Sequence, residues 1–148
     1  MYLIDTSIWI PALWKKGPQI IKDEVIQWLS EDLVSTNGMV KFELISGCKT
    51  EQELKYITEV LGGVKCLPIE QKHFEKAAMW NNKLLRQGMT VPVGDVLIAT
   101  TAMLFNQTVV HIDAHFEMIA KVVPIKLISR IDAMKAWKAE LTPPDSEK

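Results

Sequence analysis

The chain has 148 residues, of which 48% are hydrophobic and 24% are charged, and its formal net charge is −1. This composition excludes a disordered chain, and the length fits one domain with a core of its own. The balanced charge excludes the broad basic surface of a general nucleic-acid coat protein, so any contact with nucleic acid must be local or assisted by metal ions.

Two cysteines, Cys48 and Cys66, lack the spacing of a zinc site, and we expect two small buried thiols in a reducing cytosol. No signal segment opens the sequence, and the most apolar stretch, 96–105, is far shorter than the ~20 residues that span a bilayer. We therefore expect a cytoplasmic protein without a membrane segment.

Apolar runs alternate along the chain with longer segments of helical periodicity. Gly17 and Pro18 predict a break between the first two helices, and Pro11 is expected to weaken the first helix unless it lies in the opening turns. In chain order we expect a strand at 2–4, helices at 8–15 and 20–29, a strand at 33–36, helices at 39–46 and 51–61, a strand at 64–67, helices at 71–87 and 95–105, a strand at 108–112, a helix at 115–122, a strand at 125–128 and a helix at 131–141.

Strands that alternate with helices predict an α/β fold, with a central five-stranded parallel sheet covered by helices on both faces as three α/β/α layers. The strands are continuous apolar runs, as expected for a sheet buried on both sides. Ligands of such sheets bind beyond the carboxyl ends of the strands. That edge is where we look for functional residues.

Asp5 follows the first predicted strand and Asp113 follows the fourth, so both should lie at this edge. Each acid has a purely structural alternative as the N-cap of the following helix. For Asp113 capping alone is the simpler explanation. Thr6 and Ser7 could cap in place of Asp5.

Two further acids lie on predicted helices. Asp95 enters a helix that is apolar almost all round, where it could simply favour the helix dipole, but where burial would be costly without a cation or donor. Glu43 lies on a helix with a narrow polar face and could be an ordinary surface glutamate. Four acids converging at one edge would repel one another, and Mg²⁺ or Mn²⁺ would relieve that repulsion and suit phosphodiester hydrolysis.

Three stretches, YLIDTSIWI, MVKFELISG and VPVGDVLIATTAMLFNQTVVHIDAHFEMIA, resemble the PIN-domain ribonucleases, most closely the VapC toxins of bacterial and archaeal toxin-antitoxin pairs. The resemblance covers nearly the whole chain. It implies that residues 1–128 form a PIN-like nuclease domain and that residues 129–148 are a C-terminal helix and frayed tail of the same domain.

The resemblance implies a metal-dependent endoribonuclease with Asp5, Glu43, Asp95 and Asp113 as both catalytic and metal-binding residues. Thr6 or Ser7 would be a hydroxyl helper that orients Asp5 or a metal-bound water. The implied partners are an RNA substrate such as transfer RNA or ribosomal RNA, a small antitoxin protein and a second copy of the chain.

The sequence departs from the common family pattern after the fourth strand, where His111 replaces a small hydroxyl residue and His115 stands near where a further acid can occur. Either histidine could touch substrate phosphate or shuttle a proton. The alternative is that His111 packs at the strand end and His115 is an exposed residue at a helix start.

Several positions keep two interpretations. The tryptophans of the first two helices could anchor an antitoxin or pack in the core, and four lysines near the edge could meet RNA phosphates or be ordinary solvated residues. The tryptophans are Trp9, Trp14 and Trp28, and the lysines are Lys15, Lys16, Lys41 and Lys49.

Other functions fit less well. A response-regulator receiver would need a pair of acids after the first strand, and a haloacid-dehalogenase-type phosphatase would need Asp-x-Asp where this chain has Asp5-Thr6-Ser7. A catalytically inactive PIN-fold binding module would tolerate loss of the four acids, which are all present. A structure-specific DNA nuclease would be expected to carry an added DNA-binding part.

Overall fold

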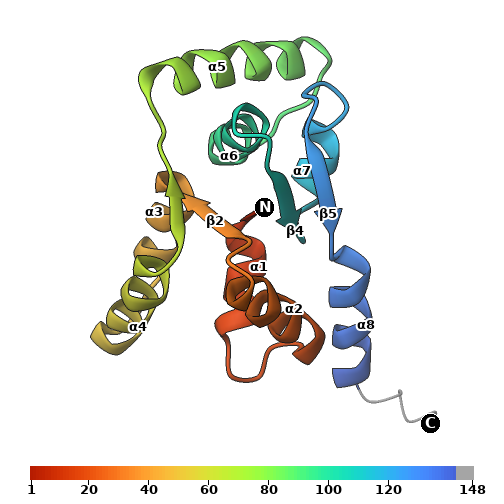
Figure 1. The fold of residues 1–148 in the computed structure, drawn as a ribbon. Helices are drawn as coiled ribbons and strands as arrows, with labels where there is room; N and C mark the ends of the chain where they lie inside the picture. The colour runs from red at the N-terminus through yellow and green to blue at the C-terminus, as the bar shows by residue number, and fades with distance from the viewer. Residues whose placement is uncertain (143–148) are drawn as a thin grey trace, which may run out of the picture.

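The computed structural model describes residues 1–142 as a five-stranded parallel sheet with helices on both faces (Figure 1). The strands are β1 (Tyr2–Ile4), β2 (Val34–Asn37), β3 (Lys65–Leu67), β4 (Thr108–His111) and β5 (Lys126–Ser129). The helices are α1 (Thr6–Leu13), α2 (Gln19–Ser30), α3 (Gly38–Ser46), α4 (Glu51–Gly62), α5 (Gln71–Arg86), α6 (Val93–Leu104), α7 (Ala114–Ile119) and α8 (Ile131–Leu141). The predicted fold class is confirmed.

The strand order β3-β2-β1-β4-β5 determines where a ligand site can form. The chain builds outward from β1 through β2 to β3, and then crosses back to place β4 on the other side of β1. The connections therefore diverge between β1 and β4, where Ile4 pairs with Val110. Such a switch point leaves a crevice beyond the carboxyl ends of the two strands.

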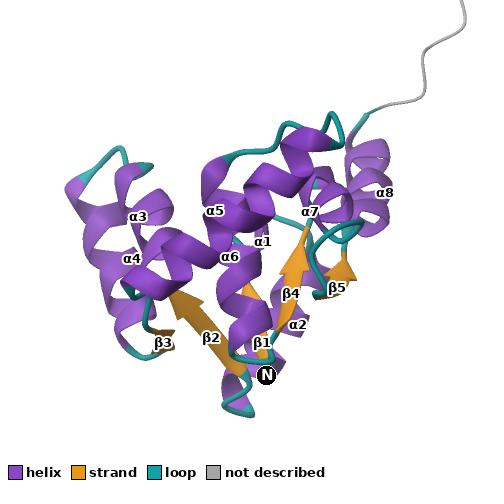
Figure 2. Cartoon of the chain, turned by 90° about the horizontal axis from the view of Figure 1, so that it is seen from above, coloured by secondary structure: helices purple, strands orange, loops and turns teal. Residues whose placement is uncertain are grey.

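The helices cover the sheet from opposite sides, with α1 and α2 on one face and α5 and α6 toward the other (Figures 1 and 2). This division follows from right-handed crossover connections. When the chain reverses its direction across the sheet, the connecting helices change to the opposite face. Helix α6 packs on both α5 and β4 and lies over the middle of the sheet.

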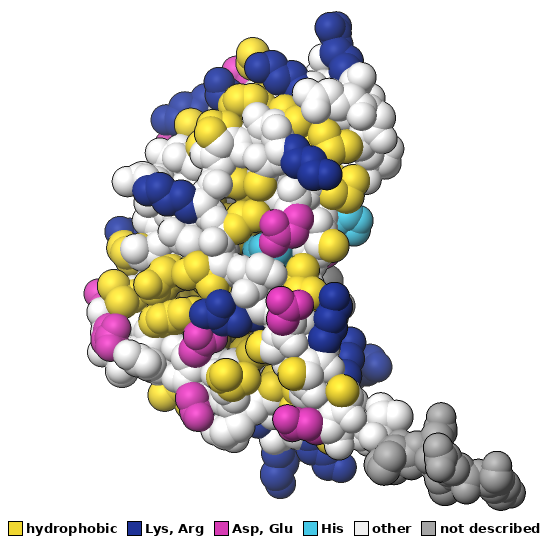
Figure 3. Space-filling model, turned by 90° about the vertical axis from the view of Figure 1, so that its right-hand side faces the viewer, with side chains coloured by type: hydrophobic (Ala, Val, Ile, Leu, Met, Phe, Trp, Pro, Cys, Tyr) yellow, Lys and Arg dark blue, Asp and Glu magenta, His cyan; other side chains and the backbone are white. Residues whose placement is uncertain are grey.

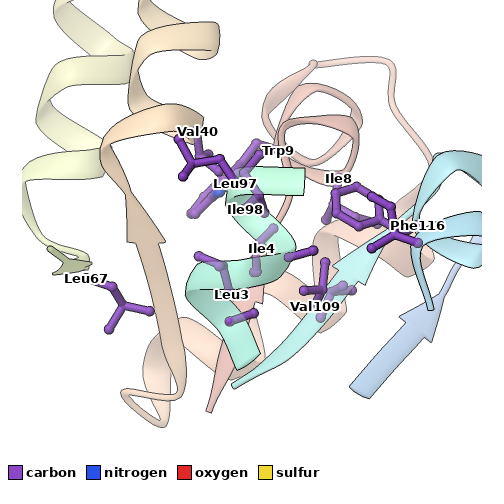
Figure 4. Packing of buried hydrophobic residues seen from close by; sticks show 14 of the residues in the cluster. Leu3, Ile4, Ile8, Trp9, Val40, Leu67, Leu97, Ile98, Val109 and Phe116 are labelled. Carbon is purple, nitrogen blue, oxygen red and sulfur yellow. The ribbon is translucent and has the colours of Figure 1, made fainter. Parts of the chain in front are cut away.

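The core forms where α1 and α6 meet the two central strands (Figure 4). Leu3 and Ile4 of β1, Val109 of β4 and Ile98 of α6 are fully buried. Every residue of α6 from Asp95 to Ala102 is buried, which agrees with its almost continuous apolar sequence. A central apolar helix thus carries a carboxylate in its first turn to the edge of the sheet.

The first helix differs from its predicted range 8–15. It begins at Thr6 because the side chain of Asp5 caps it, and it ends at Leu13, two residues after the internal Pro11. Pro11 has no amide hydrogen, so it removes one helical hydrogen bond near the end of α1. The predicted break at Gly17 is confirmed, and a β-carbon there would clash with the carbonyl oxygen of Pro11.

The expectation of two buried thiols is wrong. Cys48 is half-buried and Cys66 is exposed on the short strand β3, where two of three residues face solvent. None of the helices within residues 1–142 is both long and apolar enough to cross a membrane. Part of the predicted frayed tail, 143–148, lies outside the described residues.

Candidate active site

Asp5 lies at the end of β1 and is 4% exposed. Its amide donates to the carbonyl of Val110 (3.0 Å), which ties this strand end to β4. Its carboxylate accepts a hydrogen bond from the amide of Ser7 (2.9 Å) and so caps α1. Capping uses one carboxylate oxygen, so the structural and the functional interpretations of Asp5 are compatible.

Asp113 follows β4 and caps α7, where its Oδ1 accepts from the amide of His115 (2.9 Å). The neighbouring amide of Ile112 donates to the hydroxyl of Ser7 (3.0 Å), across 105 positions of sequence. Ser7 therefore fastens the ends of β1 and β4 together and fixes the spacing between Asp5 and Asp113.

Asp95 is the third residue of α6 and is 8% exposed. Its Oδ2 atom is fully buried and has no hydrogen-bond partner among residues 1–142. Burying an unpaired carboxylate oxygen is unfavourable unless a cation or donor compensates for the lost water. The structure thus leaves an acceptor at the front of α6 that is directed into the group of acids.

Glu43 comes from the middle of α3, and its Oε2 accepts a hydrogen bond from the hydroxyl of Thr6. Thr6 or Ser7 was expected to orient Asp5 or a metal-bound water. In this structure Ser7 donates to Asp5 through its amide, and Thr6 donates to Glu43. Gly94 lies on the other side of this carboxylate, since a β-carbon at position 94 would come within 2.9 Å of Glu43 Oε1. The hydrogen bond from Thr6 and the space beside Gly94 therefore position the flexible side chain of Glu43.

The acids lie close enough together for their charges to raise the pKa of Asp5, Glu43 and Asp95. Burial, and then repulsion from Asp5, Asp113 and Glu43, raises the pKa of Asp95 to about 7, while His115 lowers it. Burial also raises the pKa of Asp5 and of Glu43, with smaller contributions from neighbouring acids, and hydrogen bonds from Ser7 and Thr6 respectively oppose the rise. Such a set of raised pKa values is typical of a functional site that binds a cation.

One group of side chains has donor atoms close enough to hold a single ion. Oxygen atoms of Asp95 and Asp113 and a ring nitrogen of His115 all lie within 4.8 Å of one another. Asp5 and Glu43 lie near this group, as their effect on the pKa of Asp95 shows. The donor chemistry and the unpaired Asp95 oxygen both fit a divalent metal ion.

The two histidines have different environments. His111 is fully buried at the end of β4 and packs against Phe116, with ring centroids 5.1 Å apart, so it does not reach a substrate from this position. Its Nε2 atom lies 3.3 Å from Glu117, and burial lowers its pKa. The side chain of His115 is 40% exposed and faces the acids.

The three tryptophans also differ in how far they are exposed. Trp9 is fully buried, and Trp28 is packed on Tyr2 with ring centroids 4.6 Å apart, so both have structural roles. Trp14 is 52% exposed. It lines a groove of about 530 Å³ between α1 and the α3–α4 pair, and Ile10, Tyr56 and Glu43 also line this groove.

Sequence reasoning missed Gly94 as a site residue. Gly94 was given no role from the sequence, although a glycine directly before a buried acid is a signal of close approach. The link from Thr6 to Glu43 joins residues 37 positions apart and left no signal in the sequence.

Comparison with protein families gives a match to the PIN domain over residues 2–122. The chain is 29% identical over 133 residues to the VapC ribonuclease Mb1587 of Mycobacterium bovis and to Ribonuclease VapC11 of Mycobacterium tuberculosis. Each alignment covers 87% of this chain and 98% of the relative.

Similar solved structures include DNA-bound VapBC from Salmonella typhimurium (TM-score 0.73, 20% identity, 86% of this chain and 96% of that chain). VapBC2 from Rickettsia felis bound to a promoter DNA fragment is also similar (TM-score 0.71, 19% identity, 86% of this chain and 97% of that chain). At these identities the likeness establishes the fold.

Proposed function

Because this chain belongs to the PIN domain family, we propose that it is a divalent-metal-dependent endoribonuclease that acts in the cytoplasm as the toxin of a toxin-antitoxin pair. Relatives named as VapC ribonucleases support the activity, and solved structures named as VapBC support the pairing. The single observation that carries the proposal is the convergence of acids from β1, α3, α6 and the β4–α7 junction at the switch point of the sheet.

Asp5, Glu43, Asp95 and Asp113 would hold Mg²⁺ or Mn²⁺ through carboxylate oxygens, the ligands that these cations prefer. When bound, such an ion makes water a better nucleophile and stabilises negative charge on the leaving oxygen of a phosphodiester. The unpaired oxygen of buried Asp95 supports this assignment because it needs a positive partner.

The residues around the acids keep them in position. The Ser7 amide fixes Asp5, the Ser7 hydroxyl fixes the β4 end before Asp113, and the Thr6 hydroxyl fixes Glu43. Carboxylates held in this way lose little freedom when a cation and substrate arrive, so the site is organised before the reaction.

The substrate would be RNA, with transfer RNA or ribosomal RNA as the structured candidates. Lysine and arginine side chains alternate with acidic ones on the face in Figure 3, so a long nucleic-acid contact there would be electrostatically weak. Lys15 and Lys49 line the groove that also holds Glu43, and both would meet phosphates near the acids.

The same groove would receive a segment of the antitoxin. Its wall includes the half-exposed apolar side chains of Ile10, Trp14 and Tyr56, and apolar side chains grouped in one groove are typical of an interaction site. A segment with an apolar anchor for Trp14 and a cationic residue toward Glu43 would match both parts of this groove.

A homodimer is also part of the proposal. Phe74, Ala78 and Leu85 recur on one side of α5 at i, i+4 and i+11, and all three are exposed. An apolar stripe at this spacing on a surface helix is suited to packing against a second helix. Light scattering of the purified chain would measure this assembly directly.

The proposal is tested with purified parent protein, Asp5→Asn and Asp95→Asn, each incubated with structured RNA, single-stranded DNA and duplex DNA in Mg²⁺ or Mn²⁺. Asparagine preserves the cap at position 5 and has nearly the shape of aspartate at both positions, so both variants should fold. Asp132→Asn is the matched control, because Asp132 is an exposed acid on α8.

We expect the parent and the control to cut RNA and both site variants to lose at least about 100-fold in rate, since each removes a charge that holds the cation. Parent-level cleavage by either site variant would overturn the mechanism. Preferential cutting of DNA, or RNA binding without cleavage, would instead support a DNA nuclease or an inactive binding module.

A further inference from the structure

His115, the second residue of α7, faces the candidate metal centre. Its Nδ1 atom lies 2.8 Å from Oδ1 of Asp113 and 3.5 Å from Oδ2 of Asp95. The ring is held between an acid that caps its own helix and an acid from a neighbouring one. Residues from two helices thus bring one nitrogen and two oxygens together.

These close contacts are not formed hydrogen bonds. Both His115 Nδ1 and Asp95 Oδ2 are buried atoms without a hydrogen-bond partner among residues 1–142. Buried polar atoms are normally paired, so two unpaired atoms facing each other indicate that a third component belongs between or beside them. Asp95 is only 8% exposed, and its fully buried, unpaired Oδ2 atom, directed toward His115, is the independent sign that this component is a ligand.

The spacing fits a shared cation. Ligand atoms lie roughly 2.0–2.2 Å from a small divalent ion, so two ligands of one ion lie about 2.8–4.4 Å apart. The two distances from Nδ1 fall within this range, and all three donor atoms lie within 4.8 Å of one another. A small side-chain adjustment would bring the set around one ion.

We propose that His115 is a metal ligand through Nδ1 and that it makes this site prefer a transition-metal ion such as Mn²⁺ over Mg²⁺. The inference rests on the proposed function only in that both use the same metal centre. Mg²⁺ binds almost exclusively to oxygen, whereas imidazole nitrogen is a ligand of first-row transition ions. A mixed set of carboxylates and one imidazole therefore discriminates in favour of the transition ion.

The test uses the full chain, stripped of metal by chelation and studied without RNA. Mn²⁺ and Mg²⁺ affinities are measured by calorimetry for the parent, for His115→Gln, and for His73→Gln as the control. Glutamine at position 115 offers oxygen in place of nitrogen without adding charge. His73 lies on α5, where its ring accepts from the Glu70 amide, and glutamine can also accept there.

Pulsed electron paramagnetic resonance of the Mn²⁺ complex gives the decisive signal, because a directly bound imidazole nitrogen couples to the unpaired electrons of the ion. We expect nitrogen coupling in the parent and in His73→Gln, and its loss in His115→Gln. We also expect the ratio of Mn²⁺ to Mg²⁺ affinity to fall by at least about tenfold in His115→Gln, since one nitrogen ligand is lost.

Absence of nitrogen coupling in the parent would overturn the inference, whatever the variants do. The inference would also be overturned if His115→Gln kept the nitrogen coupling of the parent, or if its ratio of Mn²⁺ to Mg²⁺ affinity were unchanged. Neither result depends on nuclease activity. Failure to cut RNA would count against the proposed function, while the nitrogen signal would still support His115 as a ligand.

Discussion

Gly94 leaves the space in which the carboxylate of Glu43 lies. A β-carbon at position 94 would approach both Glu43 Oε1 and Met39 Cε to 2.9 Å, closer than normal packing allows. Both of these atoms are the ends of flexible side chains, so a methyl group would displace them without breaking the backbone. Gly94 thus affects where an acid of α3 lies, although Gly94 itself belongs to α6.

We therefore expect Gly94→Ala to impair the site but not the fold. Displacing Glu43 should lower RNA cleavage and divalent-ion affinity by about tenfold, which is the scale of losing one well-placed interaction. The melting temperature should stay unchanged or rise, because alanine favours a helix over glycine by about 0.5–1 kcal/mol. Cleavage rates, metal titration and calorimetric melting measure the three effects.

Gly62→Ala is the control for this substitution. Gly62 is also helical, and a β-carbon there has no neighbouring atom within 4 Å. It should keep parent activity and gain a little stability. If both alanine variants cut RNA at the parent rate, Gly94 does not position Glu43.

A second prediction concerns the hydroxyl of Thr6, which donates to Glu43 Oε2. Thr6→Val keeps the shape of the side chain and removes the donor. The pKa of Glu43 should then rise further, because the hydrogen bond from Thr6 opposes the effect of burial. We expect metal affinity near neutral pH and cleavage to fall by about tenfold, on the scale of 1.4 kcal/mol for one charge-assisted hydrogen bond.

Thr6→Ser retains the hydroxyl and should recover most of this loss in the same titration and cleavage assays. A serine variant as impaired as the valine variant would mean that the methyl group of Thr6 matters more than its hydrogen bond.

Much of the site was predictable because its main features are local in sequence. Asp5 and Asp113 each follow an apolar strand directly, and parallel strands end at one edge, so their proximity follows from topology alone. Capping was treated as an alternative to a functional role, whereas the structure shows both acids capping helices at the same edge.

Features that depend on side-chain direction were not predictable. Trp9 and Trp14 lie on and just beyond one short helix, yet one is fully buried and the other is 52% exposed. Which face of α1 meets the sheet depends on packing with α2 and β4, and the apolar sequence on both faces of α1 gives no preference. The partner of Thr6 likewise depends on how α1 meets α3.

The C-terminal helix gives a third prediction. Arg130, just before α8, binds Glu24 of α2 through two contacts of 2.6 and 2.8 Å. No residue of α8 is buried, and Trp137 meets Trp14 edge-on at 5.9 Å. We infer that α8 is an accessory element of the same domain that the fold does not require.

A chain ending after Arg130 should therefore fold, bind Mn²⁺ with parent affinity, and melt only a few degrees lower. Removing Trp137 should expose Trp14 further, seen as a red shift in tryptophan fluorescence. In the full chain, Arg130→Met should lower the free energy of unfolding by about 1 kcal/mol, as expected for the loss of a partly exposed ion pair with good geometry. Failure of the shortened chain to fold would show that α8 is essential.

The last prediction follows from the pKa of Asp95, which is raised from 3.8 to about 7 chiefly by burial and then by repulsion from the other acids. Between these two values the folded protein holds a proton that the unfolded chain has released. The free energy of unfolding should therefore fall as the pH rises through this window, and the Asp95 contribution should be lost above pH 7. Asp5 and Glu43, whose pKa values are also raised, act in the same direction.

Without metal, we expect the melting temperature to drop by about 5 °C between pH 5 and pH 8, since ~1 kcal/mol is worth 2–4 °C in a chain of this size. Millimolar Mn²⁺ should raise it much more at pH 8 than at pH 5, because the ion binds the ionised carboxylates. Asp95→Asn should flatten the metal-free profile and reduce the gain from Mn²⁺. Buried His111 has a lowered pKa and acts in the opposite direction, stabilising the fold above about pH 6.5. If the melting temperature of the metal-free parent rises with pH, and if the profile of Asp95→Asn is the same, then repulsion among the acids does not control stability.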